Sequence, residues 1–281
     1  MASMHRLRIS AISYLNTAPL MWDFEHGETG RHLKEKFDVT YTIPSACAES
    51  LRAGTADVGI IPVAAYATIP GLLILPGVAI AALDAVRSIL LVSRKPLDQV
   101  ESVALDTSSM TSVALCKVLL AKWLGGSREY SSMPPNLEAM LGACDAALLI
   151  GDPALFVQRP SYATVIDLAE VWRKQTGKPF VFAFWAVREA ALAGAGIQPE
   201  AVQKLAEVFQ RSRDHGLAPE NIRSTATEWG ARLGMSVSEV TAYLTTNIHY
   251  FLDAQCQEGL RLFYRYAEEI GALPGVTLEV L

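Results

Sequence analysis

A stretch of the chain from Val58 to Leu83 carries no charged residue, and it sets the first limit on the fold. As a helix, a segment of that length could cross a lipid bilayer. Prolines and glycines interrupt it at short intervals and would break such a helix repeatedly: Gly59, Pro62, Pro70, Gly71, Pro76 and Gly77. Short buried strands joined by turns accommodate these residues. We therefore expect buried strands and turns here, and no membrane span.

Length and charge narrow the class of protein. The 281 residues exceed the roughly 250 that one hydrophobic core usually organises, so we expect two lobes. Hydrophobic residues make up 51% of the chain, which excludes a disordered protein. The net charge is −5, and lysines and arginines are scattered singly, so a surface able to neutralise nucleic-acid phosphates is missing. We expect no nucleic-acid partner, and the sequence leaves the oligomeric state open.

Strands and helices alternate in the first part of the chain. Residues Arg8–Ser13, Val39–Ile43 and Asp57–Pro62 have the pattern of short buried strands. Helix starts follow the first two, at Asn16 and at Pro44. Such alternation predicts parallel strands joined by crossover helices, with a ligand site at the carboxyl ends of the strands.

A similar unit recurs about ninety residues later, where Asp145–Gly151 repeats the pattern of Asp57–Pro62. Between the two copies lie an apolar strand, Ser88–Ser93, and a Ser/Thr cluster at Thr107–Ser112 that precedes a helix over Val113–Leu124. The repetition predicts two α/β lobes of like construction.

After the apolar strand Phe180–Val187 the chain turns to helices only. Apolar residues at three- and four-residue spacing predict four of them, over Pro199–Asp214, Pro219–Leu233, Ser236–Leu252 and Gln255–Ile270. Ser236 and Glu239 form the sequence signature of a capping box at the third.

The simplest arrangement is discontinuous. Lobe one comprises residues 1–90 and 187–281, including the helical tail, and lobe two comprises residues 91–186, with a ligand cleft between them. The design resembles the type II periplasmic-binding-protein fold, in which lobes close on a ligand by hinge motion. The predicted fold is thus a two-lobed α/β fold of that type with a helical C-terminal segment.

Signatures of cofactor and metal binding are absent from the sequence. Histidines are dispersed, and the cysteines lie too far apart for a metal finger: Cys47, Cys116, Cys144 and Cys256. We expect reduced, buried thiols, no metal and no cofactor. No export signal is visible, so we expect a cytoplasmic protein.

The loops expected at the cleft carry mainly neutral polar groups. These are Tyr14, Asn16, Thr17, Ser45, Cys47, Ser88, Ser108, Ser109, Thr111, Ser112, Gly151 and Asp152, beside the aromatic Phe182. That set suits a small anionic ligand, since a helix N-terminus and hydroxyl donors can hold a carboxylate without arginine.

Each of these groups also has a structural alternative. The Ser/Thr cluster and the Asn16–Thr17 pair can simply cap helices. Asp152 can form a turn instead of acting as a base or hydrogen-bond acceptor, and Phe182 can pack in the core instead of against a ring-shaped ligand.

One string, Ser13-Tyr14-Leu15-Asn16-Thr17-Ala18-Pro19-Leu20, strongly resembles the chorismate dehydratase family, which opens the futalosine route to menaquinone. The likeness continues in order through further strings up to about residue 188: Pro44-Ser45, Asp57–Val63, Ser88 with Leu91–Arg94, Ser112–Leu115, Ile150–Leu155 and Thr176–Ala183. A sister family that acts later in the pathway shares the fold, but a different first loop is expected there.

This resemblance implies that chorismate loses water to give 3-[(1-carboxyvinyl)oxy]benzoate, without a cofactor. The ring carboxylate acidifies the hydrogen at C3, the C4 hydroxyl leaves, and aromatisation drives the reaction. Asn16 and Ser88 are carried over as the first choices for polar groups at the reacting ring, with Asp152 as the one matched carboxylate. The base is then either Asp152 or the enolpyruvyl carboxylate of the substrate itself.

Two other functions remain open at this point. The chain could be a non-catalytic cytoplasmic binding module for a small carboxylate, or a later enzyme of the same pathway built on the same fold.

Overall fold

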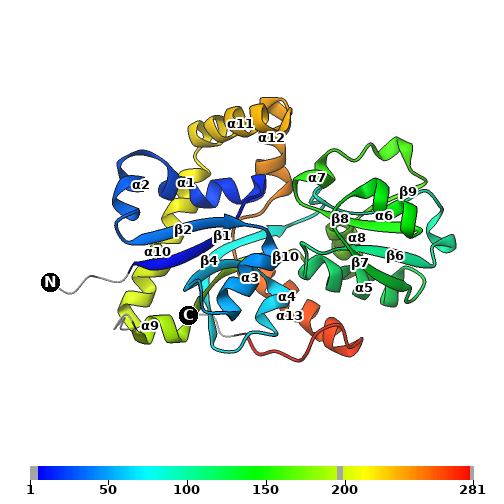
Figure 1. Cartoon of the computed structure of the whole chain (residues 1–281), viewed down its shortest axis with the longest axis horizontal. Coiled ribbons are helices and arrows are strands. Elements are labelled where there is room, and N and C mark those ends of the chain that lie inside the picture. Colours follow the sequence, from blue (N-terminus) through cyan, green and yellow to red (C-terminus); the bar gives the residue numbers. More distant parts are fainter. Residues whose placement is uncertain (1–5, 195–198, 279–281) are drawn as a thin grey trace.

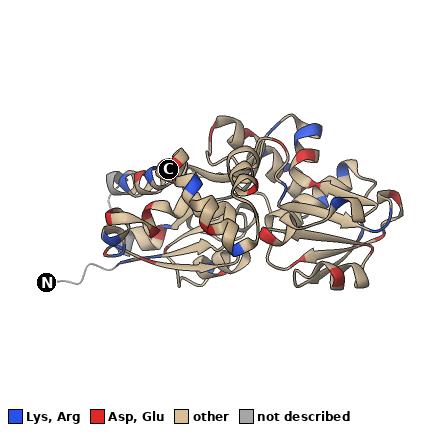
Figure 2. Cartoon of the chain, turned by 90° about the horizontal axis from the view of Figure 1, so that it is seen from above, with Lys and Arg blue, Asp and Glu red and all other residues tan. Residues whose placement is uncertain are grey.

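The computed structural model describes residues 6–194 and 199–278, which form two lobes side by side (Figure 1). Each lobe is built on a five-stranded sheet covered by helices. The two-lobed α/β fold expected from the sequence is confirmed, as is the helical C-terminal segment. Charged residues of both signs are interspersed over both lobes (Figure 2).

Both sheets have the same plan. In the first, the strands lie in the order β2 (Phe37–Thr42), β1 (Leu7–Ile12), β3 (Val58–Pro62), β10 (Phe180–Arg188) and β4 (Leu72–Ala82). In the second, the order is β7 (Glu129–Met133), β6 (Ser102–Asp106), β8 (Ala146–Ile150), β5 (Ile89–Ser93) and β9 (Thr164–Asp167). The two repeated sequence units become β3 and β8, which are the middle strands, so the internal repeat is structural.

Strand direction is mixed in both sheets. The strands β1, β2 and β3 are parallel, as are β6, β7 and β8. On the other side of each middle strand, β10 and β5 run antiparallel to both of their neighbours. The expectation of parallel pairing holds only for the first half of each sheet.

The helices that precede β10 in the chain are divided between the two lobes. Those of the first lobe are η1 (Leu15–Met21), α1 (Trp22–Glu25), α2 (Gly27–Leu33), α3 (Pro44–Arg52) and α4 (Val63–Tyr66). Those of the second are η2 (Leu97–Gln99), α5 (Thr111–Trp123), α6 (Leu137–Ala143), α7 (Asp152–Leu155), η3 (Arg159–Ser161) and α8 (Leu168–Thr176).

The helical tail covers the first lobe and reaches the second. It consists of α9 (Glu189–Gly194), α10 (Pro199–Gly216), α11 (Pro219–Leu233), α12 (Val237–Ala242), the π-helical turn η4 (Tyr243–Asn247) and α13 (Ala254–Glu269). Helix α10 packs on β4, whereas α13 packs both on β10 of the first sheet and on α5 of the second lobe.

The uncharged stretch forms β3, α4 and the long strand β4, as expected for buried strands and turns. Pro76 and Gly77 lie where the pairing of β4 with β10 shifts register, so the missing proline N–H falls at an irregularity of the sheet. Gly77 has a φ of 82° there. Among the described residues, no helix is long and apolar enough to cross a membrane.

The passages between lobes differ from the predicted boundaries. The strand β10, which was expected mostly in lobe two, lies entirely in the first sheet, and β5 belongs to the second. The chain therefore crosses at residues 83–88 and returns before Phe180. Arg87 has a φ of 65° within the first crossing, and the buried Asp167 accepts hydrogen bonds from the backbone N–H groups of Val86 (3.2 Å) and Arg87 (2.7 Å).

The helix predicted over Ser236–Leu252 is wrong in its second half. The capping box at Ser236 and Glu239 is present, but regular helix ends at Ala242 and a π-helical turn follows. Beyond it the backbone of His249 pairs with Ala81 of β4, with N···O distances of 2.8 and 2.9 Å. The apolar residues that suggested a helix are instead buried against the edge of the first sheet.

Candidate active site

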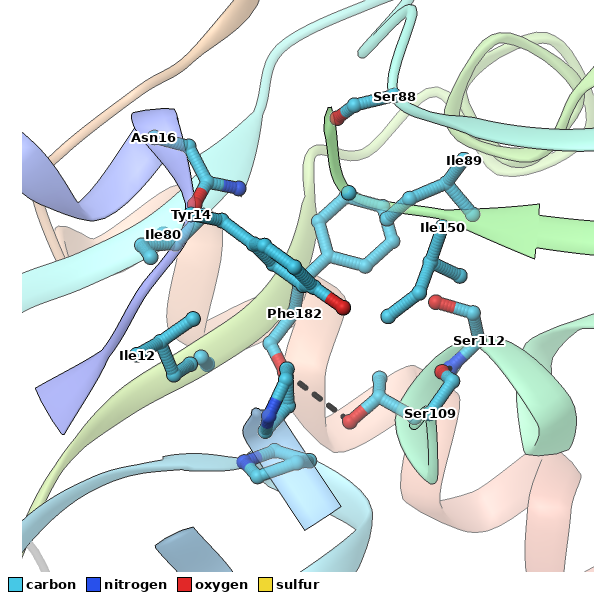
Figure 3. A pocket seen from close by; sticks show the side chains of 15 residues that line it. Ile12, Tyr14, Asn16, Ile80, Ser88, Ile89, Ser109, Ser112, Ile150 and Phe182 are labelled. Atoms are coloured by element: carbon cyan, nitrogen blue, oxygen red, sulfur yellow. Dashed lines mark hydrogen bonds between the residues drawn. The ribbon is translucent and has the colours of Figure 1, made fainter. Parts of the chain in front are cut away.

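A cavity lies between the lobes, at the carboxyl ends of the parallel strands, with about 440 Å³ of empty space that includes its opening to solvent (Figure 3). Both lobes contribute to its walls: Ile12, Tyr14, Asn16, Pro44, Pro62, Ile80, Ser88, Ile89, Ser109, Thr111, Ser112, Ile150, Gly151, Phe182 and Ala183. None of these described lining residues carries a charge. Eight of the residues expected at the cleft line it, namely Tyr14, Asn16, Ser88, Ser109, Thr111, Ser112, Gly151 and Phe182.

Tyr14 and Gly151 face each other across the cavity wall. Gly151 has φ 68° and ψ −154°, a backbone conformation almost restricted to glycine. A Cβ atom on Gly151 would lie 2.6 Å from Cε2 of Tyr14, so the ring packs directly on the glycine backbone. The Tyr14 hydroxyl is 3.4 Å from Oγ of Ser108 in the other lobe. Burial raises the pKa of Tyr14, so its hydroxyl stays protonated at neutral pH.

Asn16 and Ser88 come together around a residue of the C-terminal segment. The Tyr243 hydroxyl, fully buried, donates to Oγ of Ser88 at 2.9 Å. The Asn16 side chain lies close enough to lower the pKa of the same phenol. Ser88 is fully buried and lies in the wall of the cavity. In Figure 3 the Asn16 amide nitrogen points into the space between the labelled side chains.

The hydroxyls of the Ser/Thr cluster at the start of α5 form hydrogen bonds within the protein, and several of these side chains also line the cavity. Thr111 Oγ1 donates to the carbonyl of Phe182 (3.0 Å) and accepts from the N–H of Ala64 (3.1 Å), so it ties α5 to the first lobe. Ser109 Oγ accepts from the N–H of Ser112 at 3.2 Å, which is a capping bond. The side chains of Ser109 and Ser112 nevertheless both line the cavity.

Ser108 does not line the cavity. Its hydroxyl donates to Oδ1 of the buried Asp106 at 2.5 Å, and its N–H donates to the same oxygen at 2.8 Å. The other oxygen of Asp106 accepts from the N–H of Ile150 at 3.2 Å. Burial raises the pKa of Asp106, and these hydrogen bonds oppose the rise. Asp106 thereby fixes the turn from which Ser108 meets Tyr14.

Asp152 also lies outside the described lining of the cavity. Its carboxylate accepts from the N–H of Leu15 in the other lobe, at 3.0 and 3.3 Å. Burial raises its pKa to about 6, while the Leu15 N–H and the Arg232 guanidinium oppose the rise. The contact spans the two lobes beside the first loop.

The remaining predicted residues, Thr17, Ser45, Cys47 and Phe182, contact other parts of the protein. Thr17 is buried and donates to Oδ1 of Asn16 at 3.4 Å. Ser45 contacts the second lobe through its backbone N–H, which donates to the carbonyl of Ser108 at 3.1 Å. Cys47 is fully buried beside Ser10, and burial raises the pKa of its thiol to about 11. The Phe182 ring lines the cavity and also packs on Phe180, with ring centroids 4.7 Å apart.

Two residues of the site were missed in the sequence analysis. Asp106 ends a strand and precedes Ser108 by two positions, a spacing typical of a side chain that bonds the backbone of its own turn. Tyr243 offers no such signal, since it stands in an amphipathic helical stretch where an aromatic residue predicts core packing.

One group of potential metal ligands comes together far along the chain. His249, Asp253 and Cys256 have side-chain ligand atoms within 4.8 Å of one another. Asp253 caps α13 and accepts from His249 at 2.8 Å, and burial raises the pKa of the Cys256 thiol to about 12. None of these three residues lines the cavity.

The chain is similar in sequence to known proteins along most of its length. A protein family described as menaquinone biosynthesis matches residues 7–269. Chorismate dehydratase of Thermus thermophilus is 32% identical over 256 residues, which cover 84% of this chain and 88% of that protein. Chorismate dehydratase of Campylobacter jejuni is 34% identical over 89 residues, covering 31% of this chain and 40% of that protein.

Solved structures share the fold. A protein of Archaeoglobus fulgidus superposes with a TM-score of 0.76 at 17% identity and covers 96% of this chain and 99% of that one. The alkanesulfonate-binding protein of Xanthomonas axonopodis pv. citri, bound to MOPS, has a TM-score of 0.69 at 17% identity, with coverage of 100% and 99%. The fold is therefore that of periplasmic binding proteins, as the sequence predicted.

Proposed function

Because the chain belongs to the menaquinone biosynthesis family that includes chorismate dehydratases, we propose that it converts chorismate to 3-[(1-carboxyvinyl)oxy]benzoate and water. The observation that carries this proposal is the similarity to the Thermus thermophilus chorismate dehydratase along most of both chains. The reaction as proposed uses no cofactor, and we place it in the cytoplasm.

The cavity supports a small dicarboxylate with a ring. Its walls combine apolar side chains, such as Ile12 and Phe182, with the hydroxyl and amide groups of Ser88, Ser112 and Asn16. The first turn of the 13-residue helix α5 opens onto it, and the positive end of a helix favours a carboxylate. An uncharged lining also keeps the local dielectric low, which strengthens hydrogen bonds to charge that develops during the reaction.

Asn16 and Ser88 are proposed to act on the reacting ring. Neither is a base at neutral pH, so their part is to orient the substrate and to donate hydrogen bonds. Ser88 can hydrogen-bond to the departing C4 hydroxyl, and the Asn16 amide can hydrogen-bond to a carboxylate whose charge grows as the C3 hydrogen leaves.

The base is proposed to be the enolpyruvyl carboxylate of the substrate. The lining offers no carboxylate among the described residues, and Asp152 directs its oxygens at the Leu15 N–H. Holding the substrate carboxylate next to the C3 hydrogen makes the proton transfer intramolecular, and such proximity can replace a protein base. Asp152 then serves to hold the first loop against the second lobe.

The decisive experiment is to mix the purified protein with chorismate and to follow the product by ultraviolet absorbance and mass. We expect an aromatic product lighter than chorismate by one water. Binding of chorismate without any change of mass would favour a non-catalytic binding module of this fold. Neither binding nor turnover would favour a later enzyme of the same pathway.

Substituting Asn16 or Ser88 by alanine tests the proposed site. Each variant should lower kcat by about 10²-fold or more, as expected when a donor to developing charge is removed. Circular dichroism and thermal unfolding should remain near those of the wild type. Near wild-type rates in both folded variants would refute the site assignment.

A further inference from the structure

We infer that Tyr243, from the C-terminal helical segment, is a positioning residue for the proposed reaction: its hydroxyl orients the Ser88 hydroxyl so that the serine proton points into the cavity. The inference rests on the proposed function, and it assigns a role to a residue outside the described lining of the cavity.

Tyr243 lies beside two residues of the cavity wall. Oδ1 of Asn16 accepts from Thr17 at 3.4 Å, and the Asn16 side chain lies close enough to Tyr243 to lower the pKa of the phenol. Tyr243 in turn donates its own proton to Oγ of Ser88 at 2.9 Å. Asn16, within η1, and Ser88, just before β5, thus both lie next to one buried phenol.

The count of donors fixes the direction of the serine proton. A serine hydroxyl has one hydrogen and two acceptor lone pairs. Tyr243 occupies a lone pair, so the hydrogen remains available. The other hydrogen bond of Ser88 within the described ranges, to the Val86 carbonyl, is 3.5 Å long, well beyond the 2.5–3.0 Å usual for O–H···O bonds. A substrate hydroxyl in the cavity would be the better acceptor.

The backbone holds Tyr243 in place from both sides. It opens the π-helical turn Tyr243–Asn247, and such turns often occur at functional sites. At the other end of the turn, Nδ2 of Asn247 donates to the Ala85 carbonyl at 2.9 Å. The turn is therefore bonded at both ends to residues 85–88, the crossing segment that carries Ser88.

The phenol also stays a donor at every pH at which the protein works. Burial raises the pKa of Tyr243 well above its ordinary value. The orientation of Ser88 should therefore not depend on pH.

The test is Tyr243→Phe, which removes the hydroxyl and keeps the ring. With chorismate as substrate, kcat should fall about tenfold while KM changes less than about threefold, since the ground-state complex keeps its contacts. In a double-mutant cycle, Tyr243→Phe should have no further effect on kcat once Ser88 is alanine, because Tyr243 acts through Ser88. A residue that only stabilises the fold would lower kcat by the same factor in both backgrounds.

Tyr250→Phe is the matched control. Tyr250 is also a buried tyrosine of the same segment, but its hydroxyl has no hydrogen-bond partner in the described part of the chain. Its removal should leave kcat and KM unchanged.

Three outcomes overturn the inference. Wild-type kcat in a folded Tyr243→Phe protein contradicts it. So does a double variant in which Tyr243→Phe lowers kcat by the same factor in the Ser88→Ala background as in the wild type. If Tyr243→Phe does not fold, Asn247→Ala takes its place, since it removes the bond from the turn to Ala85 and leaves the phenol intact. Wild-type kcat in Asn247→Ala is the third outcome that contradicts the inference. Absence of turnover in the wild type would instead refute the proposed function, on which the inference depends.

Discussion

Gly151 is the residue at which backbone conformation and the site depend most directly on each other. Its φ and ψ suit only glycine, and the Tyr14 ring lies where a side chain would begin. The Gly151 N–H also donates to the Ser88 carbonyl at 2.8 Å, so the same residue ties β8 to the start of β5. Gly151 is expected at the cleft because it follows a strand, but the reason for a glycine there is the opposing Tyr14 ring.

Replacing Gly151 by alanine should displace Tyr14 from its contact with Ser108. We expect a loss of about 1–3 kcal/mol in the free energy of unfolding, because an alanine in this backbone region is strained, together with a lower kcat/KM. Urea unfolding and steady-state kinetics measure the two effects. Gly177→Ala is the control, since Gly177 has a φ of 68° but open space around it; it should leave kcat/KM unchanged. Equal kcat/KM in the two variants would contradict the role given to Tyr14.

The carboxyl of Asp152 should make stability depend on pH. Burial raises its pKa from 3.8 to about 6, so the folded protein binds this proton more tightly than the unfolded chain does. Its contribution to the free energy of unfolding is therefore complete below about pH 4 and is lost as the pH rises through about 6. In Asp152→Asn the amide oxygen still accepts from Leu15, but nothing titrates.

Urea unfolding of the wild type and Asp152→Asn at pH 4.5 and 7.5 checks this. The variant should gain stability relative to the wild type as the pH rises across that interval. An unchanged difference would show that the carboxyl is not perturbed as described. The same variant should keep most of the turnover at pH 7.5 if the substrate supplies the base; loss of turnover with binding retained would point to Asp152 as the base instead.

Among the elements, the helices were predicted better than the strands at the sheet edges. The helices α10, α11 and α13 follow from amphipathic spacing, because one face of each is buried on a lobe. The strand β7, with the sequence Glu-Tyr-Ser-Ser-Met, is mostly exposed at the edge of its sheet and has no buried face that would produce an alternating pattern. It exists because β6 offers a partner for its backbone.

The capping box at the start of α12 is an element-scale feature that can be tested alone. Oγ of Ser236 accepts from the N–H of Glu239 at 3.2 Å, and the Glu239 carboxylate accepts from the N–H of Ser236 at 2.8 Å. Ser236→Ala should lower the free energy of unfolding by about 1 kcal/mol and leave kcat unchanged, since the box is exposed and neither of its residues lines the cavity. Ser236→Asp, which restores an N-cap acceptor, should recover most of the loss in thermal unfolding. Equal melting temperatures for wild type and Ser236→Ala would contradict this account.

At the scale of the whole molecule, α13 packs on both lobes, and none of its residues lines the cavity. Its fully buried Phe263 packs against Phe180 of β10, with ring centroids 5.0 Å apart, and against Trp172 of α8 at 6.3 Å. Lys122 of α5 forms an ion pair with Glu269 at the end of the helix. The lobes therefore share part of their hydrophobic core.

Phe263→Ala should uncouple the lobes. Removing a fully buried phenylalanine costs about 3–5 kcal/mol. Because this one links both lobes, the two should then unfold in separate steps. Urea unfolding followed by tryptophan fluorescence and by far-ultraviolet circular dichroism should give coincident curves for the wild type and separate ones for the variant. Coincident curves in the variant would show that the lobes are coupled by other contacts.

The sequence by itself determined the two-lobed α/β plan, the internal repeat, the buried nature of Val58–Leu83 and the loops that meet at the cleft. These follow from local patterns, since strand periodicity, helix caps and proline positions depend on neighbours in the chain. The tertiary structure alone decided which polar groups face the cavity. Thr111 and Asp152 bond across the lobes, Cys47 is buried in the core, and Tyr243 reaches Ser88 from far along the chain. Each of these depends on contacts between segments distant in sequence, which no local pattern records.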